Sequence, residues 1–455
     1  MRLTHSIGAS VVVSAITALP AAAQGLCGAP GADLAISHID GVRNYSPSEG
    51  VDSVVLATRQ TNVGGVAIVA DLVTAQHPVM AENIYCHSLV NGVSRFEQLG
   101  MGWCFHAGIP LNMGGYCTCQ GGSNSTIGPG CSDPHSATLM GTASMLGPRW
   151  EVNASSGAAA HPHATPVGPH GGRVTVLLSD VDPAANIDAS FFGEVLVVHV
   201  DEDAANTWNN ATWRPVSVAY LNSSATFALA GASHPGEAAL LAWKTLVPGV
   251  VEAVVDVPDD GRFLLAARAL RIGGNQWNYE YAVFNLNSHR AARAFSLECP
   301  DAIQIGEHGF HDVDYHSGDG PGGVSIAGTD WVFDGSADAA RWETDAFEMN
   351  PTANALRWGT LYNFRVSCNA VPLMGTAALE LFRPGGPAAI DIVITVPGGP
   401  SCLGDHDGDG SRAVSDIFAF LSDWFSGSTA GDADGDDATT VPDIFRFLAS
   451  WFPGC

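Results

Sequence analysis

Lysine is almost absent from this sequence: Lys244 is the only one, and lysine plus arginine total 19 against 46 aspartates and glutamates. The formal net charge at neutral pH is −27. A chain of this charge repels nucleic-acid phosphates and anionic lipid headgroups, so it is not expected to bind either in a general way. An acidic surface favours cations instead.

Long hydrophobic runs are also missing beyond the first segment of the chain. No later run approaches the about 20 apolar residues that are needed to cross a bilayer, so we expect no membrane span. The chain begins with Met1-Arg2, an apolar stretch and the small residues Ala21-Ala22-Ala23. This order predicts a secretory signal peptide over residues 1–23 and a mature protein that is secreted or held at the cell surface.

The familiar catalytic motifs are absent: we find no G-x-S-x-G, no H-E-x-x-H and no phosphate-binding loop. The segment around Asp312, Asp314 and His316 is the best remaining candidate for catalysis. On a strand these side chains would share one face, as a metal site or as a carboxylate pair for glycoside hydrolysis. A polar loop that leaves a strand gives the same pattern, so we assign no catalytic residue and lean against an enzyme.

Histidines and aromatic residues leave two further alternatives open. His161, His163 and His170 lie in a Gly/Pro/Ala-rich segment, where they are a copper or zinc clamp or simply exposed loop residues. Aromatic side chains near expected strand ends could stack on sugars or fill a core. These aromatic residues are Trp208, Trp213, Trp277, Tyr279, Trp331, Trp342 and Trp358.

All ten cysteines follow the predicted signal peptide, and an even number in an exported chain favours disulfides. We expect Cys299 to pair with Cys368 and Cys402 with Cys455, because each pair falls within one proposed module. The six N-terminal cysteines leave their pairing open. Cys117 and Cys119, flanked by Cys104 and Cys131, could alternatively hold zinc.

Short β-branched runs bounded by glycine, proline, asparagine or aspartate predict strands in two blocks. The expected strands are 51–58, 66–74, 174–179, 195–200 and 216–220 in the first block, and 250–257, 263–270, 279–287, 294–297, 361–366 and 389–396 in the second. Between 108 and 172 the chain is rich in Gly, Ser, Pro, Cys and His, which predicts cross-linked loops. Regular short strands without helical periodicity indicate β-sandwiches.

Beyond a Pro-Gly-Gly-Pro linker at 397–400, the chain repeats itself with a 27-residue period. Each repeat has an aspartate-rich loop followed by apolar residues at helical spacing, Ile417, Phe420, Leu421, Trp424 and Phe425 in the first. Calcium takes about six to eight oxygens, which acids at loop positions 1, 3, 5 and 12 and a carbonyl at position 7 can supply. We therefore expect two calcium ions. Their predicted ligands are Asp405, Asp407, Asp409, Asp416 and the Ser411 carbonyl in the first loop, and Asp432, Asp434, Asp436, Asp443 and the Ala438 carbonyl in the second.

Position 6 of the loop turns sharply and favours glycine. Gly410 fills it in the first loop, whereas Asp437 fills it in the second, so the second loop is expected to bind calcium more weakly. Each half is too small to bury its apolar face alone, so the two helices must pack together.

Two aspartate loops, each followed by one helix, resemble the type I dockerin over residues 402–455. The resemblance implies an EF-hand-like module that binds calcium and docks its cargo on a cohesin-like or other cell-surface protein, often in polysaccharide catabolism. The family's recognition positions correspond to Val414-Ser415 and Val441-Pro442, which are more apolar than the usual hydroxyl pair.

The sequence thus predicts a mainly β protein: two β-sandwich-like domains followed by a small α-helical dockerin-like module. The expected division is a signal peptide at 1–23, a disulfide-linked β-rich domain at 25–245, a β-sandwich at 246–396 and the module at 402–455. The β-rich cargo is expected to be a binding protein, with polysaccharide as one ligand. The alternative is a dockerin-bearing polysaccharide-degrading glycoside hydrolase.

Overall fold

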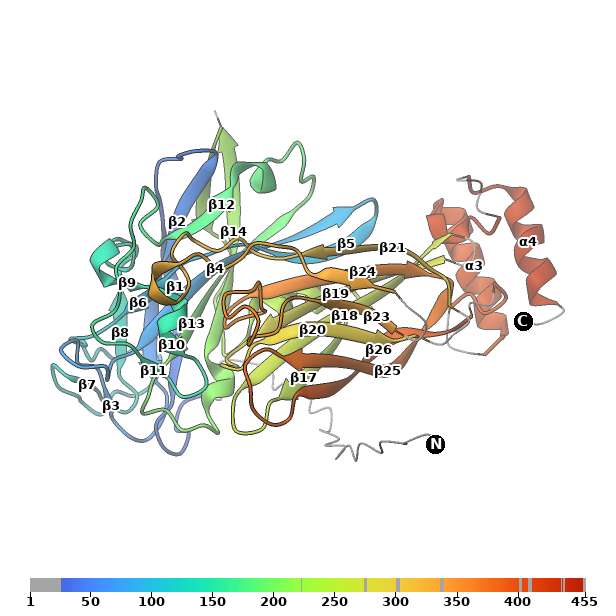
Figure 1. Ribbon diagram of the computed structural model, residues 1–455. Coiled ribbons are helices and arrows are strands. Elements are labelled where there is room, and N and C mark those ends of the chain that lie inside the picture. The colour runs from blue at the N-terminus through green and yellow to red at the C-terminus, as the bar shows by residue number, and fades with distance from the viewer. Residues whose placement is uncertain are drawn as a thin grey trace, which may run out of the picture.

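The computed structural model describes residues 26–452 except 222, 274–275, 300–302, 336–338, 401–402, 408–410, 435 and 437. The chain is mainly β, with 44% strand and 13% helix, which confirms the predicted fold class (Figure 1). The predicted signal peptide lies outside the described residues. In the described part, no helix combines the length and apolar character needed to cross a membrane.

The first half of the chain forms two facing sheets. The first sheet contains β1 (Leu34–Asn44), β2 (Val51–Asn62), β8 (Ser132–His135) and β12 (Val174–Leu177). The second sheet contains β4 (Val79–Val90), β5 (Val93–Met101), β6 (Cys104–His106), β9 (Leu146–Gly147), β13 (Ser190–Val198), β14 (Ala211–Leu221), β15 (Ser224–Leu229) and β16 (His234–Pro235). Residues such as Ile36, Leu56 and Val195 fill the space between them.

The second half adds two more sheets. The third sheet has the order β17 (Val251–Asp256), β18 (Arg262–Gly273), β19 (Gln276–Asn285), β24 (Leu361–Cys368) and β21 (Ile305–His311). The fourth has the order β22 (Val332–Asp334), β23 (Ala339–Glu343), β20 (Ala292–Glu298), β25 (Ala370–Leu381) and β26 (Ala389–Pro400). Phe295 and Phe364, with ring centroids 4.8 Å apart, lie in the core between these two sheets.

The central strands of the third sheet, β18 and β19, are buried on both faces. Leu265 and Val283 face the fourth sheet, whereas Leu264 and Phe284 join Tyr85 in an apolar cluster with the second sheet. A strand covered on both sides needs apolar residues at successive positions, which explains the unbroken run Phe-Leu-Leu-Ala-Ala in β18. The two predicted β domains therefore share a core across their boundary.

Buried polar groups also join the two halves. Arg149 donates to the carbonyl oxygens of Glu82, Gly102 and Gly359 and to Oδ1 of Asn83, at 2.7–3.1 Å. Gly359 belongs to the second half of the chain, and the other three acceptors belong to the first. A buried guanidinium that is saturated in this way holds the interface in one register.

Several predicted strands need correction. The strand expected at 66–74 is reduced to β3 (Ile68–Val69), which pairs only with β7 (Thr126–Ile127), and the rest is turn. The strands β1, β4, β5, β15, β21, β23 and β25 are among those that were not predicted. In β4 the buried polar residues Glu82 and Asn83 interrupt the apolar pattern. Small elements complete the β-rich part: β10 (Val152–Asn153) with β11 (Ala158–Ala159), α1 (Ala137–Met140) and α2 (Ala242–Leu246).

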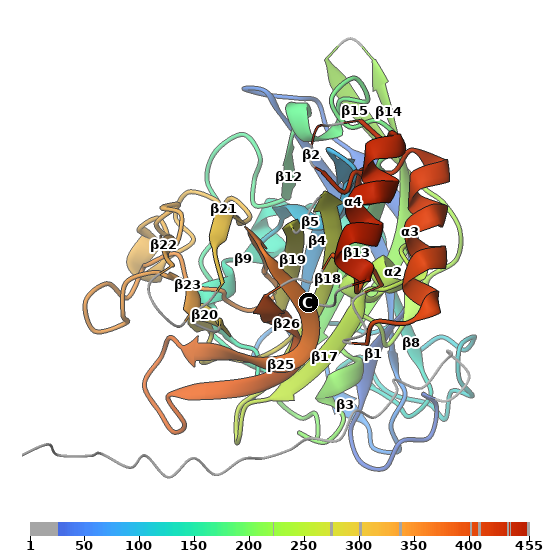
Figure 2. The same cartoon turned by 90° about the vertical axis from the view of Figure 1, so that its right-hand side faces the viewer.

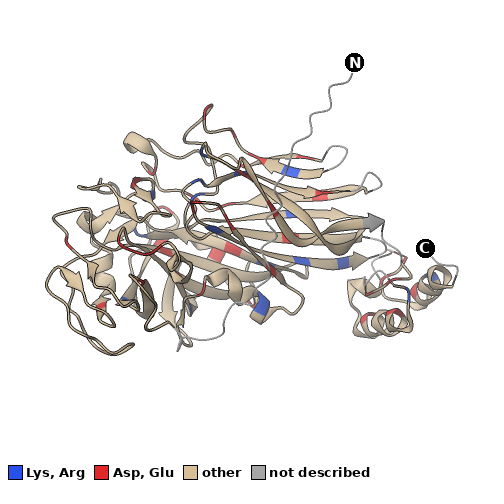
Figure 3. Cartoon of the chain, turned by 90° about the horizontal axis from the view of Figure 1, so that it is seen from below, with Lys and Arg blue, Asp and Glu red and all other residues tan. Residues whose placement is uncertain are grey.

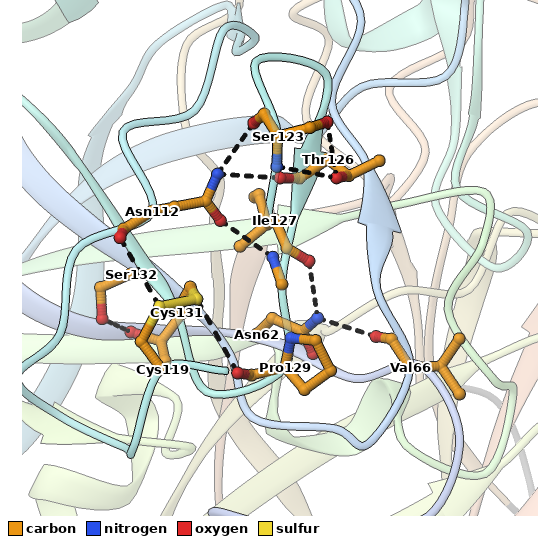
Figure 4. The surroundings of a disulfide bond; sticks show 12 residues. Asn62, Val66, Asn112, Cys119, Ser123, Thr126, Ile127, Pro129, Cys131 and Ser132 are labelled. Atoms are coloured by element: carbon orange, nitrogen blue, oxygen red, sulfur yellow. Dashed lines mark hydrogen bonds between the residues drawn. A yellow bond between two sulfur atoms is a disulfide. The ribbon is translucent and has the colours of Figure 1, made fainter. Parts of the chain in front are cut away.

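The predicted loops between 108 and 172 are held by covalent and polar cross-links. Disulfides join Cys27 to Cys117 and Cys119 to Cys131. Beside the second one, Asn112 donates to the carbonyls of Ser123 and Thr126 at 2.8 and 3.0 Å (Figure 4). Because Cys117 and Cys119 are both oxidised, the zinc alternative at this cluster is wrong.

The remaining described cysteines, Cys86, Cys104, Cys299 and Cys368, are buried thiols. The expected bond between Cys299 and Cys368 is therefore not formed in this structure. Burial raises the pKa of Cys104 to about 12 and that of Cys368 to about 11. Both stay protonated and unreactive at neutral pH. The predicted pair Cys402 and Cys455 lies outside the described residues.

Candidate metal centre

The C-terminal module lies beyond one end of the stacked sheets (Figure 1). Its two helices, α3 (Val414–Ser426) and α4 (Val441–Trp451), run side by side (Figure 2). Gly427, with a φ of 69°, ends α3 in the left-handed region that glycine occupies without strain. A single helical turn, η7 (Thr429–Gly431), then leads into the second loop.

The helices pack through equivalent residues of the two repeats. Phe420 and Phe447 stack with ring centroids 4.3 Å apart and planes inclined by only 5°. Ile417, Leu421 and Trp424 surround this pair from α3, with their counterparts from α4. Phe425, which the helical spacing placed on the same face, is instead 77% exposed.

Each repeat also closes the loop of the other. The indole nitrogen of Trp424 donates to the carbonyl oxygen of Thr440 at 2.7 Å, and that of Trp451 donates to the carbonyl oxygen of Ala413 at 3.2 Å. Ala413 and Thr440 occupy the same position of their respective loops, just before each helix. The module therefore has an internal two-fold pseudosymmetry that matches the sequence duplication.

The last acid of each loop holds the loop backbone in place. Asp416 Oδ1 accepts from the backbone nitrogens of His406 and Asp407, at 2.8 and 3.2 Å, and its Oδ2 accepts from that of Ala413 at 2.6 Å. Both carboxylate oxygens thus point into the loop from the first turn of α3, where an acid also complements the helix dipole.

Asp443 repeats this pattern in the second loop. Its Oδ1 accepts from the backbone nitrogens of Ala433 and Asp434 at 2.8 and 3.1 Å, and its Oδ2 from that of Thr440 at 2.6 Å. Burial acts to raise the pKa of Asp443, but these hydrogen bonds outweigh it and hold the pKa below its usual range.

The structure brings together three predicted ligands in each loop. Carboxylate oxygens of Asp405, Asp407 and Asp416 lie within 4.8 Å of one another in the first loop, as do those of one triplet in the second. Oxygens at that spacing can all reach one ion at the about 2.4 Å that calcium prefers. The triplet of the second loop is Asp432, Asp434 and Asp436.

The other predicted ligands are placed less fully. Asp443 lies in the second loop but outside its triplet. Ser411 and Ala438, the expected carbonyl donors, are exposed residues of their loops. Asp409 lies outside the described residues, as do Gly410 and Asp437.

The acids of the second loop interact unfavourably with one another when no cation is present. Desolvation raises the pKa of Asp434, and the carboxylates of Asp436 and Asp443 raise it further. A divalent cation would remove this repulsion. Across the whole chain, acidic segments predominate and basic ones are few (Figure 3).

The C-terminal module contacts the β-sheets of the rest of the protein. Arg271, near the end of β18, contacts His406 of the first loop, and Gly273 lies against the carbonyls of Thr429 and Asp432. Burial lowers the pKa of Arg271 to about 10, although the carboxylates of Asp423 and Asp405 oppose the shift, so the guanidinium stays charged at neutral pH. Nothing in the spacing of the sequence pointed to this contact.

Equivalent apolar residues of both repeats remain on the outside of the module. We call the set the paired apolar face. It consists of Val414, Phe418 and Phe425 of α3 with Val441, Phe445 and Phe452 of the second repeat, each 55–77% exposed. Six exposed large apolar side chains are an unusual number for so small a module.

The other candidates from the sequence are less organised. β21 ends at His311, so Asp312, Asp314 and His316 lie in a loop and do not share a strand face. Asp312 accepts from the amide of Asn354, Asp314 is exposed, and His316 Nε2 bonds the Met101 carbonyl at 2.8 Å. Of the two alternatives for Asp312, Asp314 and His316, the structure therefore supports the polar loop.

Most of the aromatic candidates are core residues. Trp213, Trp277, Tyr279, Trp331, Trp342 and Trp358 are all at most 7% exposed. Of the seven, only Trp208 is partly exposed. A pocket at the junction of the two halves is lined in part by Trp150, Tyr315, Asp319 and Arg357. Burial raises the pKa of Asp319 to about 7.

No protein-family model and no curated protein sequence matches the chain. Among solved structures, the N-terminal domain of the Streptococcus gordonii adhesin Sgo0707 is 10% identical, with 82% of this chain and 96% of that chain covered. The TM-score is 0.18, which is too low to indicate a common fold. The structure defines the chain as a mainly β protein with a small helical C-terminal module. The two disulfides among the described residues are compatible with an extracytoplasmic location.

Proposed function

We propose that this is a secreted protein whose C-terminal module binds two calcium ions and docks the β-rich cargo on a cohesin-like or other cell-surface protein. The observation that carries the proposal is the repetition of one loop geometry in both repeats. In each loop an acid of the following helix fixes three backbone N–H groups while three carboxylates converge within 4.8 Å. The paired apolar face supplies the surface for a partner.

Calcium binding is tested on the mature chain, residues 25–455, by calorimetric titration after chelation. We expect two bound ions and a stabilised module. Asp407→Asn combined with Asp434→Asn should abolish or strongly weaken both sites. These two acids are exposed, and the three backbone N–H groups that hold each loop donate to Asp416 or Asp443, which the double variant retains, so the backbone cage survives the change.

The matched control is Asp391→Asn, an exposed acid on β26 outside the module. If the double variant still bound two ions with the wild-type affinity, the calcium assignment would be wrong. If the double variant lost one ion and kept the other, the calcium assignment would stand for one loop only.

Docking is tested separately with a purified type I cohesin and the calcium-loaded mature chain. Phe418→Ala with Phe445→Ala should weaken binding by about 30-fold or more, because a buried aromatic anchor contributes about 2 kcal/mol. Val73→Ala, an equally exposed apolar residue of the first half, should change nothing. A calcium-loaded chain without measurable cohesin affinity would refute the cohesin-like partner while leaving the calcium sites in place.

A further inference from the structure

Four histidines from distant parts of the sequence gather at one place in the first half of the protein. His77 precedes β4, His106 ends β6, and His161 and His163 lie in the segment between β11 and β12. Ring centroids lie 4.1 Å apart for His106 and His163, 5.1 Å for His77 and His106, and 6.2 Å for His77 and His161. His170 does not join them: its Nδ1 is bonded to the Ser53 hydroxyl at 2.9 Å.

Hydrogen bonds fix the proton positions in the buried part of this group. His77 Nδ1 lies 2.8 Å from the carbonyl oxygen of Thr74, which can only accept, so Nδ1 carries the proton. The neutral ring holds only that proton, so Nε2 carries none. That bare Nε2 lies 2.8 Å from His106 Nδ1, which must therefore be the donor.

The relay ends at an unprotonated nitrogen. Because His106 Nδ1 carries the proton of the neutral ring, its Nε2 keeps a free lone pair. The residue is 1% exposed, and within the described part of the chain this Nε2 has no hydrogen-bond partner. An unsatisfied buried acceptor costs about 1–3 kcal/mol and requires an explanation.

Gly147 packs closely against this nitrogen. A Cβ atom at Gly147 would lie 2.6 Å from His106 Nε2 and 2.9 Å from the Cβ of His163, so only glycine permits the close approach. His163 Nδ1 contacts the carbonyl oxygen of Ala164 at 3.0 Å and therefore carries its proton. The Nε2 of His163 therefore carries no proton, and its lone pair can bind a metal.

We infer that His106, with His161 and His163, binds a divalent transition-metal ion of the kind that prefers imidazole, such as Zn²⁺ or Cu²⁺. A ligand histidine typically donates its second ring N–H to an outer partner that ends on a carbonyl or a carboxylate. The chain Thr74, His77 and His106 has this arrangement. The preference of imidazole for such ions separates this site from the oxygen-only loops of the C-terminal module.

Binding requires the loop rings to turn. In the described residues, the only triplets of ligand atoms within 4.8 Å are the two aspartate sets. The rings of His106 and His163 are nearly parallel, at 14°, so their in-plane lone pairs cannot meet at one ion until one ring tilts. His163 is half-buried and His161 exposed, so the loop rings move onto the fixed His106.

The test is a titration of the mature chain with zinc chloride in saturating calcium, so that the aspartate loops are already filled. We expect one zinc ion per chain. His161→Ala with His163→Ala should weaken zinc binding at least tenfold, whereas His170→Ala should not affect it. With Cu²⁺ as the probe, electron paramagnetic resonance should show coupling to at least two nitrogens, and this coupling should be lost in the double variant.

Three results would overturn the inference: no zinc binding by the wild-type chain, wild-type affinity in the double variant, or an equal loss in His170→Ala. The loop histidines decide the test because their replacement leaves the core intact. His106→Ala adds a second criterion, since a variant that retains the wild-type melting temperature must also lose the zinc site.

Discussion

The guanidinium Nη1 of Arg271 lies 2.7 Å from Nδ1 of His406, and both side chains are buried. Because a guanidinium only donates, His406 Nδ1 accepts, and its Nε2–H is left to donate to Asp423 at 2.8 Å. Arg271 belongs to β18, whereas His406 belongs to the first aspartate loop. A strand of the third sheet thus ends inside the hydrogen-bond network of the C-terminal module.

Replacing Arg271 should release the module from the sandwich. Arg271→Gln leaves His406 without its buried donor, which costs about 1–3 kcal/mol of docking free energy. We expect faster amide exchange in η7 and at the end of β18, and a larger radius of gyration in small-angle X-ray scattering. Arg268→Gln is the matched control, because Arg268 lies on the same strand but donates to the Pro248 carbonyl. Equal exchange in both variants would show that Arg271 does not hold the module in place.

Two glutamates with raised pKa values predict that stability falls as the pH rises. Burial raises the pKa of Glu82 from 4.5 to about 8, and that of Glu202 also to about 8. Between pH 4.5 and about pH 8, each of these glutamates has lost its proton in the unfolded chain but keeps it in the folded chain. Each such group therefore lowers the free energy of unfolding by up to about 1.4 kcal/mol per pH unit.

The measurement is chemical denaturation of the mature chain from pH 5 to pH 8. Glu82→Gln should reduce the slope and stabilise the protein at pH 8, because the neutral amide retains the shape of the protonated acid. Glu298→Gln, which changes an exposed residue, should keep the wild-type slope. A slope that is unaltered in Glu82→Gln would contradict the raised pKa.

The cysteines should fall into two classes by reactivity. Native alkylation is expected to label none of the four buried thiols, whereas denaturation should expose all of them. Peptide mapping should recover Cys27 bonded to Cys117 and Cys119 bonded to Cys131. These bridges span 90 and 12 residues, so the loss of the first should destabilise the chain more, by about 4 to 5 against about 3 kcal/mol. Native labelling of Cys299 or Cys368 would contradict their burial.

The core shared by the two halves predicts cooperative unfolding of residues 26–400. Phe284 packs between the second and third sheets and is 1% exposed. Phe284→Ala should cost about 3–5 kcal/mol and shift one common transition. Val332→Ala, at an exposed position of β22, should have almost no effect. Two separate calorimetric transitions would instead favour independent sandwiches.

The module could be predicted from the sequence because its candidate metal ligands lie close together in the chain. Asp405, Asp407 and Asp416 lie within one loop and the first turn of the helix that follows, and the duplication shows the pattern twice. The exposure of Phe425 was missed because helical spacing gives a direction but not the width of the buried stripe. Most of the predicted strands coincide with apolar runs that stand between turn residues, although several other strands were missed.

The rest depends on residues that are far apart in the chain. Arg149 meets Gly359, Cys27 meets Cys117, and Arg271 meets His406, and no local spacing encodes such pairs. The same holds for His77 and His106, each of which reads alone as an ordinary strand-end histidine. The core shared by the two halves has one sign in the sequence: the apolar run of β18 is too continuous for a strand with one solvated face.

The last prediction concerns catalysis by the cargo. Residues 25–400 are to be screened against a glycan panel for retention and for release of reducing ends, and we expect no release. A glycosidase needs an acid and a base on either side of the scissile bond. Asp312 and Asp314 lie two residues apart in one loop, the first is already engaged by Asn354 and the second is exposed, so the pair does not form such an arrangement.

Burial raises the pKa of Asp312, which by itself would suit a general acid, so the geometry and not the titration decides this case. The deciding variants are Asp312→Asn and Asp314→Asn, with Asp391→Asn as the control. Sugar release by the wild-type chain that disappears in either variant would make the cargo a polysaccharide-degrading enzyme. Because the aspartate loops lie outside residues 25–400, that result would leave the calcium assignment of the module unchanged.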